Sequence, residues 1–205
     1  MSPRPVVLAC GALASELRAV MAAQGLDDAA EVRYLPANLH NRPEGIVPLL
    51  EEHLATIDSD RTVLIAYADC GTGGLLDTMR DRVAADHPGI ARLPGAHCYE
   101  VFAGADRFAQ LHDEEPGTFY LTDFLAKHFD ALVWQGLGLD RHPALLPQYF
   151  GNYRRVVLLS QSTDAAVVEA GRAAAQRLGL AFEHHHVGRG DLTDAVVLTL
   201  KKKVA

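Results

Sequence analysis

The sequence of 205 residues is poor in cysteine, in basic residues and in long apolar runs. Its three cysteines are an odd number and widely separated, which excludes a disulfide framework. With 19 Lys and Arg against 26 Asp and Glu, the net charge of -7 argues against a nucleic-acid partner, because phosphate neutralisation needs a basic surface. No run reaches the roughly 18 apolar residues of a membrane span, and no signal-peptide core follows the amino terminus. We therefore expect a cytoplasmic protein with no membrane partner; composition leaves the oligomeric state open.

Apolar runs of strand length alternate with helical patterns along the chain. The patterns predict strands over residues 5–10, 31–35, 62–66, 118–121, 155–159 and 181–187 and helices over 15–24, 43–57, 75–86, 99–112, 122–134 and 164–179, whereas 196–200 fits either. This alternation is typical of an open, mostly parallel, doubly wound sheet of the Rossmann or flavodoxin kind, with helices on both faces. We expect a single α/β domain over residues 1–205.

A glycine-rich loop follows the third predicted strand. It consists of Asp69, Cys70, Gly71, Thr72, Gly73 and Gly74. The loop lacks the Gly-Lys-Ser/Thr ending of a Walker motif and does not fit Gly-x-Gly-x-x-Gly, so nucleotide binding gains little support. Because glycines allow close backbone approach, we expect residues 71–74 to bind a small organic ligand; the alternative is a tight turn that needs small residues.

Each cysteine lies at a strand-to-helix junction. Cys10 and Cys70 follow predicted strands, and Cys98 precedes a predicted helix. Ligands of such sheets bind at the carboxyl edge, so the three thiolates are expected to share a zinc ion or an iron-sulfur cluster. His40 follows the second strand, which lies beside the first in a sheet of order 2-1-3, and is the candidate fourth ligand. The metal hypothesis depends on this topology, because no Cys-x-x-Cys motif is present.

A metal-free enzyme is the main alternative. Cys70 at a helix amino terminus would be an activated nucleophile, with Asp69 or His97 as base or orienting group. The run His184-His185-His186 could be read as a set of metal ligands. However, side chains alternate between the two faces of a strand, so at most two of these rings point the same way. We interpret this run as a strand that emerges into solvent.

Several short motifs together resemble one known family. They are Ala9-Cys10-Gly11-Ala12-Leu13, Leu39-His40-Asn41-Arg42-Pro43, Tyr67-Ala68-Asp69-Cys70-Gly71-Thr72-Gly73, His97-Cys98 and Pro116-Gly117-Thr118-Phe119-Tyr120-Leu121-Thr122. The combination resembles the bacterial and archaeal family catalogued as domain of unknown function 1638. Family members are often encoded near corrinoid-dependent methyltransferases, so the resemblance implies a role in methylated-amine or one-carbon metabolism, with a corrinoid or methyltransferase protein as partner.

Three hypotheses follow. The first is a metal- or cluster-binding protein that acts on or binds a small organic ligand. The second is a non-catalytic accessory module that delivers a metal or ligand to a methyltransferase system. The third is the metal-free enzyme with Cys70 as nucleophile.

Overall fold

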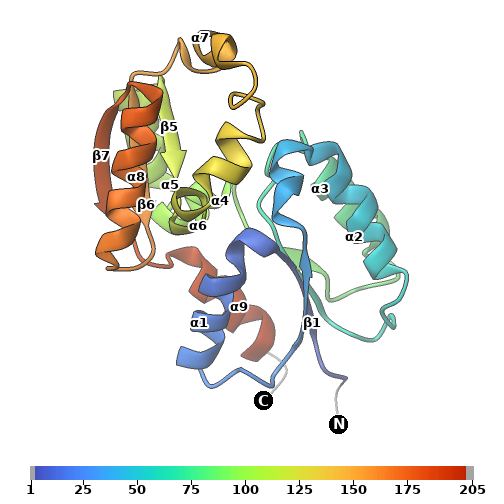
Figure 1. Cartoon of the computed structure of the whole chain (residues 1–205). Helices are drawn as coiled ribbons and strands as arrows, with labels where there is room; N and C mark the ends of the chain where they lie inside the picture. Colours follow the sequence, from blue (N-terminus) through green and yellow to red (C-terminus); the bar gives the residue numbers. More distant parts are fainter. Residues whose placement is uncertain (1–2, 202–205) are drawn as a thin grey trace. The chain divides into compact units, whose positions relative to one another are not determined.

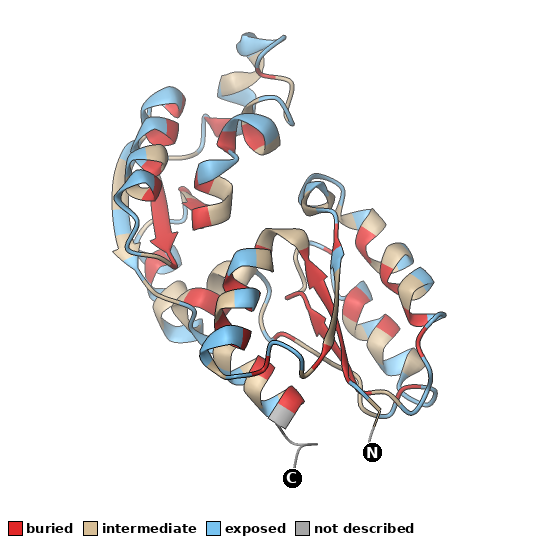
Figure 2. Ribbon diagram, turned by 60° about the horizontal axis from the view of Figure 1, so that its bottom comes forward, coloured by how far each residue is buried: buried red, intermediate tan, exposed pale blue. Residues whose placement is uncertain are grey.

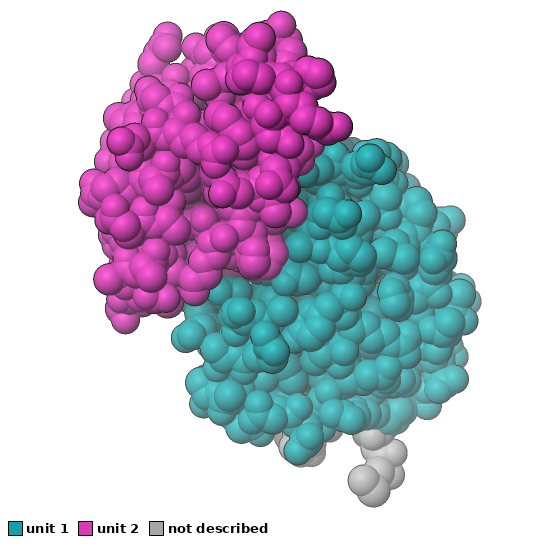
Figure 3. Space-filling view, viewed as in Figure 1, with its two compact units in different colours: residues 1–101, 189–205 teal, residues 102–188 magenta. Residues whose placement is uncertain are grey.

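The computed structural model describes residues 3–201, which form two compact units (Figure 3). Unit 1 contains residues 3–101 and 189–201, and unit 2 contains residues 102–188. Each unit has its own parallel sheet. None of the helices within residues 3–201 is long and apolar enough to cross a membrane.

Unit 1 is built on a four-stranded sheet in the order β2-β1-β3-β4. The strands are β1 (Val6–Cys10), β2 (Glu31–Leu35), β3 (Val63–Ala66) and β4 (Ala91–Arg92), and all pairs are parallel. Every residue of β1 and β3 is buried, as expected for central strands covered on both faces. The carboxyl ends of β1, β2 and β3 therefore meet at one edge, where the predicted site residues lie.

Helices cover both faces of this sheet (Figure 1). Helices α1 (Ala14–Ala23) and α9 (Asp191–Lys201) contact each other on one face, and α2 (Ile46–Leu54) and α3 (Leu75–Val83) contact each other on the other. Short 3₁₀ segments lie at the carboxyl edge: η1 (Gly11–Leu13), η2 (Ala37–Asn41) and η3 (Pro43–Gly45). Helix α4 (Cys98–Ala103) begins at the third cysteine.

Unit 2 contains a three-stranded parallel sheet in the order β5-β6-β7. Its strands are β5 (Thr118–Leu121), β6 (Arg155–Ser160) and β7 (Ala181–His186), and its helices are α5 (Ala105–Glu114), α6 (Asp123–Lys127), α7 (Leu146–Phe150) and α8 (Ala165–Leu178). A π-helical turn (Asp130–Trp134) and a 3₁₀ turn (Pro143–Leu145) lie between α6 and α7. The core gathers around β6, whose inner residues are buried (Figure 2).

The predicted α/β class with parallel strands and covering helices is confirmed, although the strands divide between two sheets. The single domain over residues 1–205 stays a prediction. The helix predicted over residues 99–112 is wrong as one element: it breaks at Gly104, whose φ of 79° a helix cannot continue. The helix predicted over 122–134 ends at Lys127, and residues 196–200 belong to α9.

Candidate functional site

The close approach of two turns brings Cys10 beside His40. Cys10 ends β1, and its sulfur accepts a 3.3 Å hydrogen bond from the Ala12 amide, so the thiol caps η1. The following Gly11 lies against the chain that leaves β2: a Cβ there would be 2.8 Å from the Leu35 carbonyl oxygen. Only glycine fits this contact without displacement, and the contact holds the two turns together.

His40 lies in η2 and is exposed as a residue, but its ring reaches the buried Cys10. The sulfur of Cys10 lies 3.8 Å from the ring Nδ1 and 4.0 Å from Nε2. Nδ1 also lies 2.9 Å from the carbonyl oxygen of Ala37. When Nδ1 carries the proton it donates to this carbonyl, which leaves Nε2 with a free lone pair.

The loops that carry Cys70 and Cys98 are hydrogen-bonded to each other. The amides of Asp69 and Cys70 donate to the carbonyls of Gly95 and Ala96, at 3.1 and 2.8 Å. Cys98 begins α4 two residues after Ala96. Cys70 has a φ of 51°, the only positive value for a non-glycine residue described between 3 and 201. An L-residue other than Asn or Asp rarely adopts this conformation, and such strain concentrates at functional sites.

All three cysteines act on the pKa of the His40 ring. Burial tends to lower the pKa of His40, but hydrogen bonding to the sulfurs of all three cysteines outweighs burial and raises the pKa far above its ordinary value. Three residues that are 28 to 88 positions apart in the chain therefore act on one imidazole. Cys10 and His40 contact each other at the carboxyl edge of the sheet, and the metal-binding role of the four residues stays a prediction.

The sulfurs also influence one another and a buried tyrosine. Burial raises the pKa of Cys98; His40 opposes this effect, whereas the charges of Cys70 and Cys10 add to it. Burial and the nearby Cys10 and Cys70 likewise raise the pKa of Tyr67, which stays protonated. The Tyr67 side chain is 1% exposed, and its hydroxyl makes no hydrogen bond of ordinary geometry. A neutral hydroxyl beside a sulfur atom is a ready hydrogen-bond donor to it.

Asp69 organises the glycine-rich loop. Its carboxylate accepts hydrogen bonds from the Thr72 hydroxyl at 2.5 Å and from the amides of Gly73 and Gly74 at 3.0 and 2.9 Å. Burial alone would raise the pKa of Asp69, but these hydrogen bonds and the charge of Arg92 lower it. The amides of Gly73 and Gly74 are therefore occupied within the loop, and Asp69 as a catalytic base stays a prediction.

Arg92 connects helix α3 to the segment of residues 93–95 that follows β4. Its guanidinium forms a two-pronged ion pair with Asp77 of α3 (2.7 and 2.6 Å) and donates to the carbonyls of Leu93 and Gly95 (2.6 and 3.2 Å). The pKa of Arg92 is raised, first by Asp77 and further by the charges of Asp69 and Cys70. The positive charge of Arg92 therefore favours an anionic loop at Cys70.

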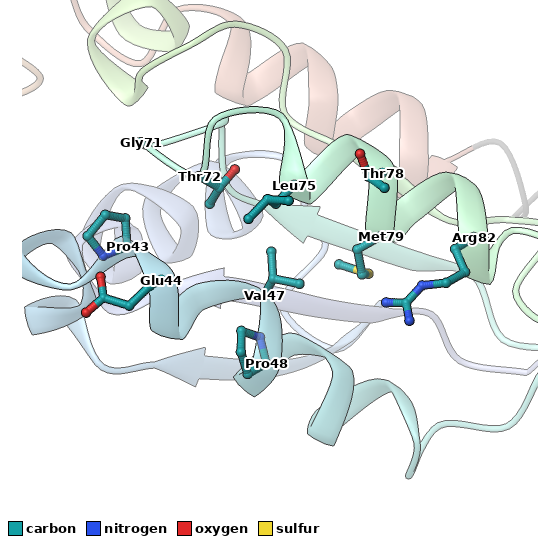
Figure 4. A pocket seen from close by; sticks show the side chains of 10 residues that line it. All are labelled: Pro43, Glu44, Val47, Pro48, Gly71, Thr72, Leu75, Thr78, Met79 and Arg82. Carbon is teal, nitrogen blue, oxygen red and sulfur yellow. The ribbon is translucent and has the colours of Figure 1, made fainter.

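A groove of about 420 Å³ begins beside the Cys70 loop and runs between α2 and α3 (Figure 4). Gly71 is close to Pro43: a Cβ there would lie 3.6 Å from the proline ring. The walls are largely apolar, and their side chains come from η3, α2, the loop and α3, including Val47, Leu75 and Met79. Of residues 71–74, Gly71 and Thr72 line this groove, so a ligand in the groove would contact the loop at these two residues.

The distance between the Cys10 sulfur and the His40 ring is slightly longer than the ligand-to-ligand distance of a zinc site. Tetrahedral zinc with sulfur at about 2.3 Å and nitrogen at about 2.0–2.1 Å places these ligands roughly 3.5 Å apart. The Cys10 sulfur lies 4.0 Å from Nε2 of His40, so binding would require a contraction of roughly half an ångström. Within residues 3–201 no set of three or more His, Cys, Asp or Glu side chains is placed to hold a metal ion as it stands.

The sequence pattern pointed to Cys10, His40, Cys70 and Cys98 but not to two of their neighbours, Tyr67 and Arg92. Tyr67 lies at the end of the central strand β3, where an aromatic hydroxyl is a signal that could have been used. Arg92 gave no such signal, because β4 has only two residues. The remaining candidate base, His97, is exposed, and its ring centroid lies 6.3 Å from that of Tyr99.

These features define an α/β protein with parallel sheets that gathers three cysteines and a histidine at one sheet edge. The family model described as protein of unknown function (DUF1638) matches residues 34–196, so the chain belongs to this family. No curated protein and no solved structure matches the chain.

Proposed function

We propose that Cys10, Cys70, Cys98 and His40 bind one thiophilic metal centre, a zinc ion or an iron-sulfur cluster. The supporting observation is the His40 ring, whose Nδ1 and Nε2 lie 3.8 and 4.0 Å from the Cys10 sulfur while Nδ1 contacts the Ala37 carbonyl. Burial lowers the pKa of this ring, and the sulfurs of Cys10, Cys70 and Cys98 together raise it. Metal-binding histidines commonly donate their second ring N–H to such a carbonyl, which orients the coordinating nitrogen. Thiolate and imidazole donors favour zinc and iron-sulfur centres over magnesium or calcium.

The four donors differ in how easily they can move. Cys10 is 3% exposed and capped by a backbone amide, whereas His40 is exposed on a short 3₁₀ segment. His40 is therefore the donor that can yield its position to a ligand, which would give the metal centre Lewis-acid chemistry. The Tyr67 hydroxyl would donate a hydrogen bond to a thiolate and stabilise its charge.

The groove beside Gly71 is the proposed place for a small organic ligand. Its apolar walls suit a hydrocarbon portion of the ligand. A polar group of the ligand would then lie at the end of the groove formed by Gly71 and Thr72, next to Cys70 in the chain. Turnover of such a ligand would make the protein an enzyme. Binding without turnover would make it an accessory module, and a corrinoid or methyltransferase protein remains the proposed partner on the family resemblance.

Elemental analysis with an absorption spectrum tests the proposal on protein purified without oxygen. We expect either zinc without visible absorption or iron with broad visible absorption. Wild-type protein that contains no metal, and takes none up when zinc or iron and sulfide are supplied, would contradict the proposal.

His40→Ala separates a four-donor site from a three-thiolate site. If His40 coordinates the metal, the variant should bind it at least about 10- to 100-fold more weakly, since even loss of a supporting residue has that effect. His97→Ala is the matched control, because His97 is an exposed histidine next to Cys98. Equal metal affinity in the two variants would remove His40 from the site.

A second candidate function, thiol chemistry at Cys70, is favoured by two observations. Cys70 has the strained φ of 51°, and the pKa of His40 is raised, so that an imidazolium faces the sulfurs. An imidazolium beside a cysteine stabilises the nucleophilic thiolate. Rapid labelling of Cys70 by iodoacetamide in metal-free protein, abolished in His40→Ala, is the result expected of this function. Slow labelling of Cys70 at the rate of an ordinary thiol would exclude it.

A further inference from the structure

The three consecutive histidines of β7 divide between the two faces of this strand. His185 lies on the face of Glu183: its Nδ1 is 3.4 Å from the Arg107 guanidinium and its Nε2 is 3.7 Å from the Glu183 carboxylate. Because strand side chains alternate, His184 and His186 share the opposite face. Both of these residues are exposed, in agreement with a strand that emerges into solvent.

The rings of His184 and His186 turn toward a single buried oxygen. Ser160 ends β6, pairs with His186 in the parallel register, and is 0% exposed. Its Oγ lies 2.9 Å from Nε2 of His184 and 3.2 Å from Nδ1 of His186. Two imidazole nitrogens from one strand face therefore converge on one hydroxyl.

We propose that His184 and His186 bind a divalent transition-metal ion such as Ni²⁺ or Zn²⁺, with the Ser160 hydroxyl and water in the remaining positions. Neutral imidazole suits these ions, whereas Mg²⁺ and Ca²⁺ prefer an all-oxygen environment. Both histidines are exposed, so an ion can reach them from solvent. The site lies at the carboxyl edge of the unit 2 sheet and does not depend on the cysteine cluster of unit 1.

The carboxylate of Asp123, at the same edge, accepts hydrogen bonds from backbone amides. Asp123 follows β5, and its two oxygens accept 2.9 Å hydrogen bonds from the amides of Gln161 and Ser162. Asp123 therefore fixes the turn after β6, which carries Ser160, and is engaged in that role. A site with two imidazoles agrees with the finding that, within residues 3–201, no set of three or more His, Cys, Asp or Glu side chains is placed to hold a metal ion.

Calorimetric titration of Ni²⁺ into the metal-free full chain tests the proposal by comparison of three variants. His184→Ala and His186→Ala should each weaken one binding event by at least about tenfold, on the scale of losing a ligand. His185→Ala, a change of the same size on the other face, should leave this event unchanged. The cysteines are present in every titration, so their contribution cancels in the comparison.

Proton NMR of the histidine rings gives a second measurement that needs no folded variant. Ni²⁺ should broaden the ring resonances of His184 and His186 in the wild-type protein before that of His185. The proposal is overturned if all three variants bind Ni²⁺ equally, if His185→Ala is as weak as the other two, or if the two ring resonances do not respond to Ni²⁺.

Discussion

Substitution of Gly11 by alanine tests the contact that holds Cys10 beside His40. The added Cβ would lie 2.8 Å from the Leu35 carbonyl oxygen and 3.3 Å from the Ala37 amide nitrogen. Both neighbours are backbone atoms, so the turn after β1 must move away from the chain that leads to His40. Overpacking of this kind costs about 1–3 kcal/mol of unfolding free energy. Metal affinity should fall as well, because the distance between sulfur and imidazole widens.

Gly25→Ala is the matched control for Gly11→Ala. Gly25 has a φ of 64° and would place its Cβ within 4 Å of nothing, so strain alone destabilises this variant, by about 1 kcal/mol. Denaturant unfolding measures the loss of stability in each of the two variants, and a zinc titration with a competing chelator measures the zinc affinity of each. Weaker zinc binding only in Gly11→Ala is expected. Equal zinc affinity in both variants, despite a measured stability loss, would refute the reasoning.

Two further predictions concern Cys98 and Asp69. Cys98→Ser should abolish stoichiometric metal binding in elemental analysis, while circular dichroism stays that of a folded α/β protein; full metal content would remove Cys98 from the site. Asp69→Asn should lower the unfolding free energy at pH 7 by about 1–3 kcal/mol, because a charged acceptor of three hydrogen bonds is lost. The pKa of Asp69 is lower in the folded state than in the unfolded state. Its contribution to the unfolding free energy is therefore complete above the unfolded-state pKa of about 3.9 and is lost as the pH falls through the folded-state pKa. The two proteins should therefore converge in stability below about pH 3.9, and a constant difference across this range would contradict the assignment.

The position of the cysteines was predictable because a parallel sheet gathers strand ends at one edge. Apolar runs located β1 and β3, and the order β2-β1-β3 placed the loop of His40 beside Cys10. No such rule locates Cys98, because β4 has two residues and Pro94-Gly95 interrupts the pattern. Its placement depends on the hydrogen bonds between the Cys70 loop and residues 95–96.

Other features of the site depend on contacts between distant segments. The alternation of strands and helices does not indicate that a second sheet begins at β5, since each strand is a plausible neighbour of the one before. The glycines of residues 71–74 predicted close backbone approach of a ligand, but a preceding carboxylate can occupy the amide donors of such a loop, as Asp69 does for Gly73 and Gly74. The convergence of His184 and His186 on Ser160 requires the pairing of β6 with β7.

X-ray absorption at the metal edge of the purified protein tests the central claim most directly, because it reports the ligand atoms and their distances. For zinc, the account predicts three sulfur ligands at about 2.3 Å and one nitrogen ligand at about 2.0–2.1 Å. His40→Ala should lose the nitrogen contribution and keep the sulfurs. A spectrum that contains only nitrogen and oxygen ligands would contradict the assignment of Cys10, Cys70 and Cys98 as the metal-binding residues.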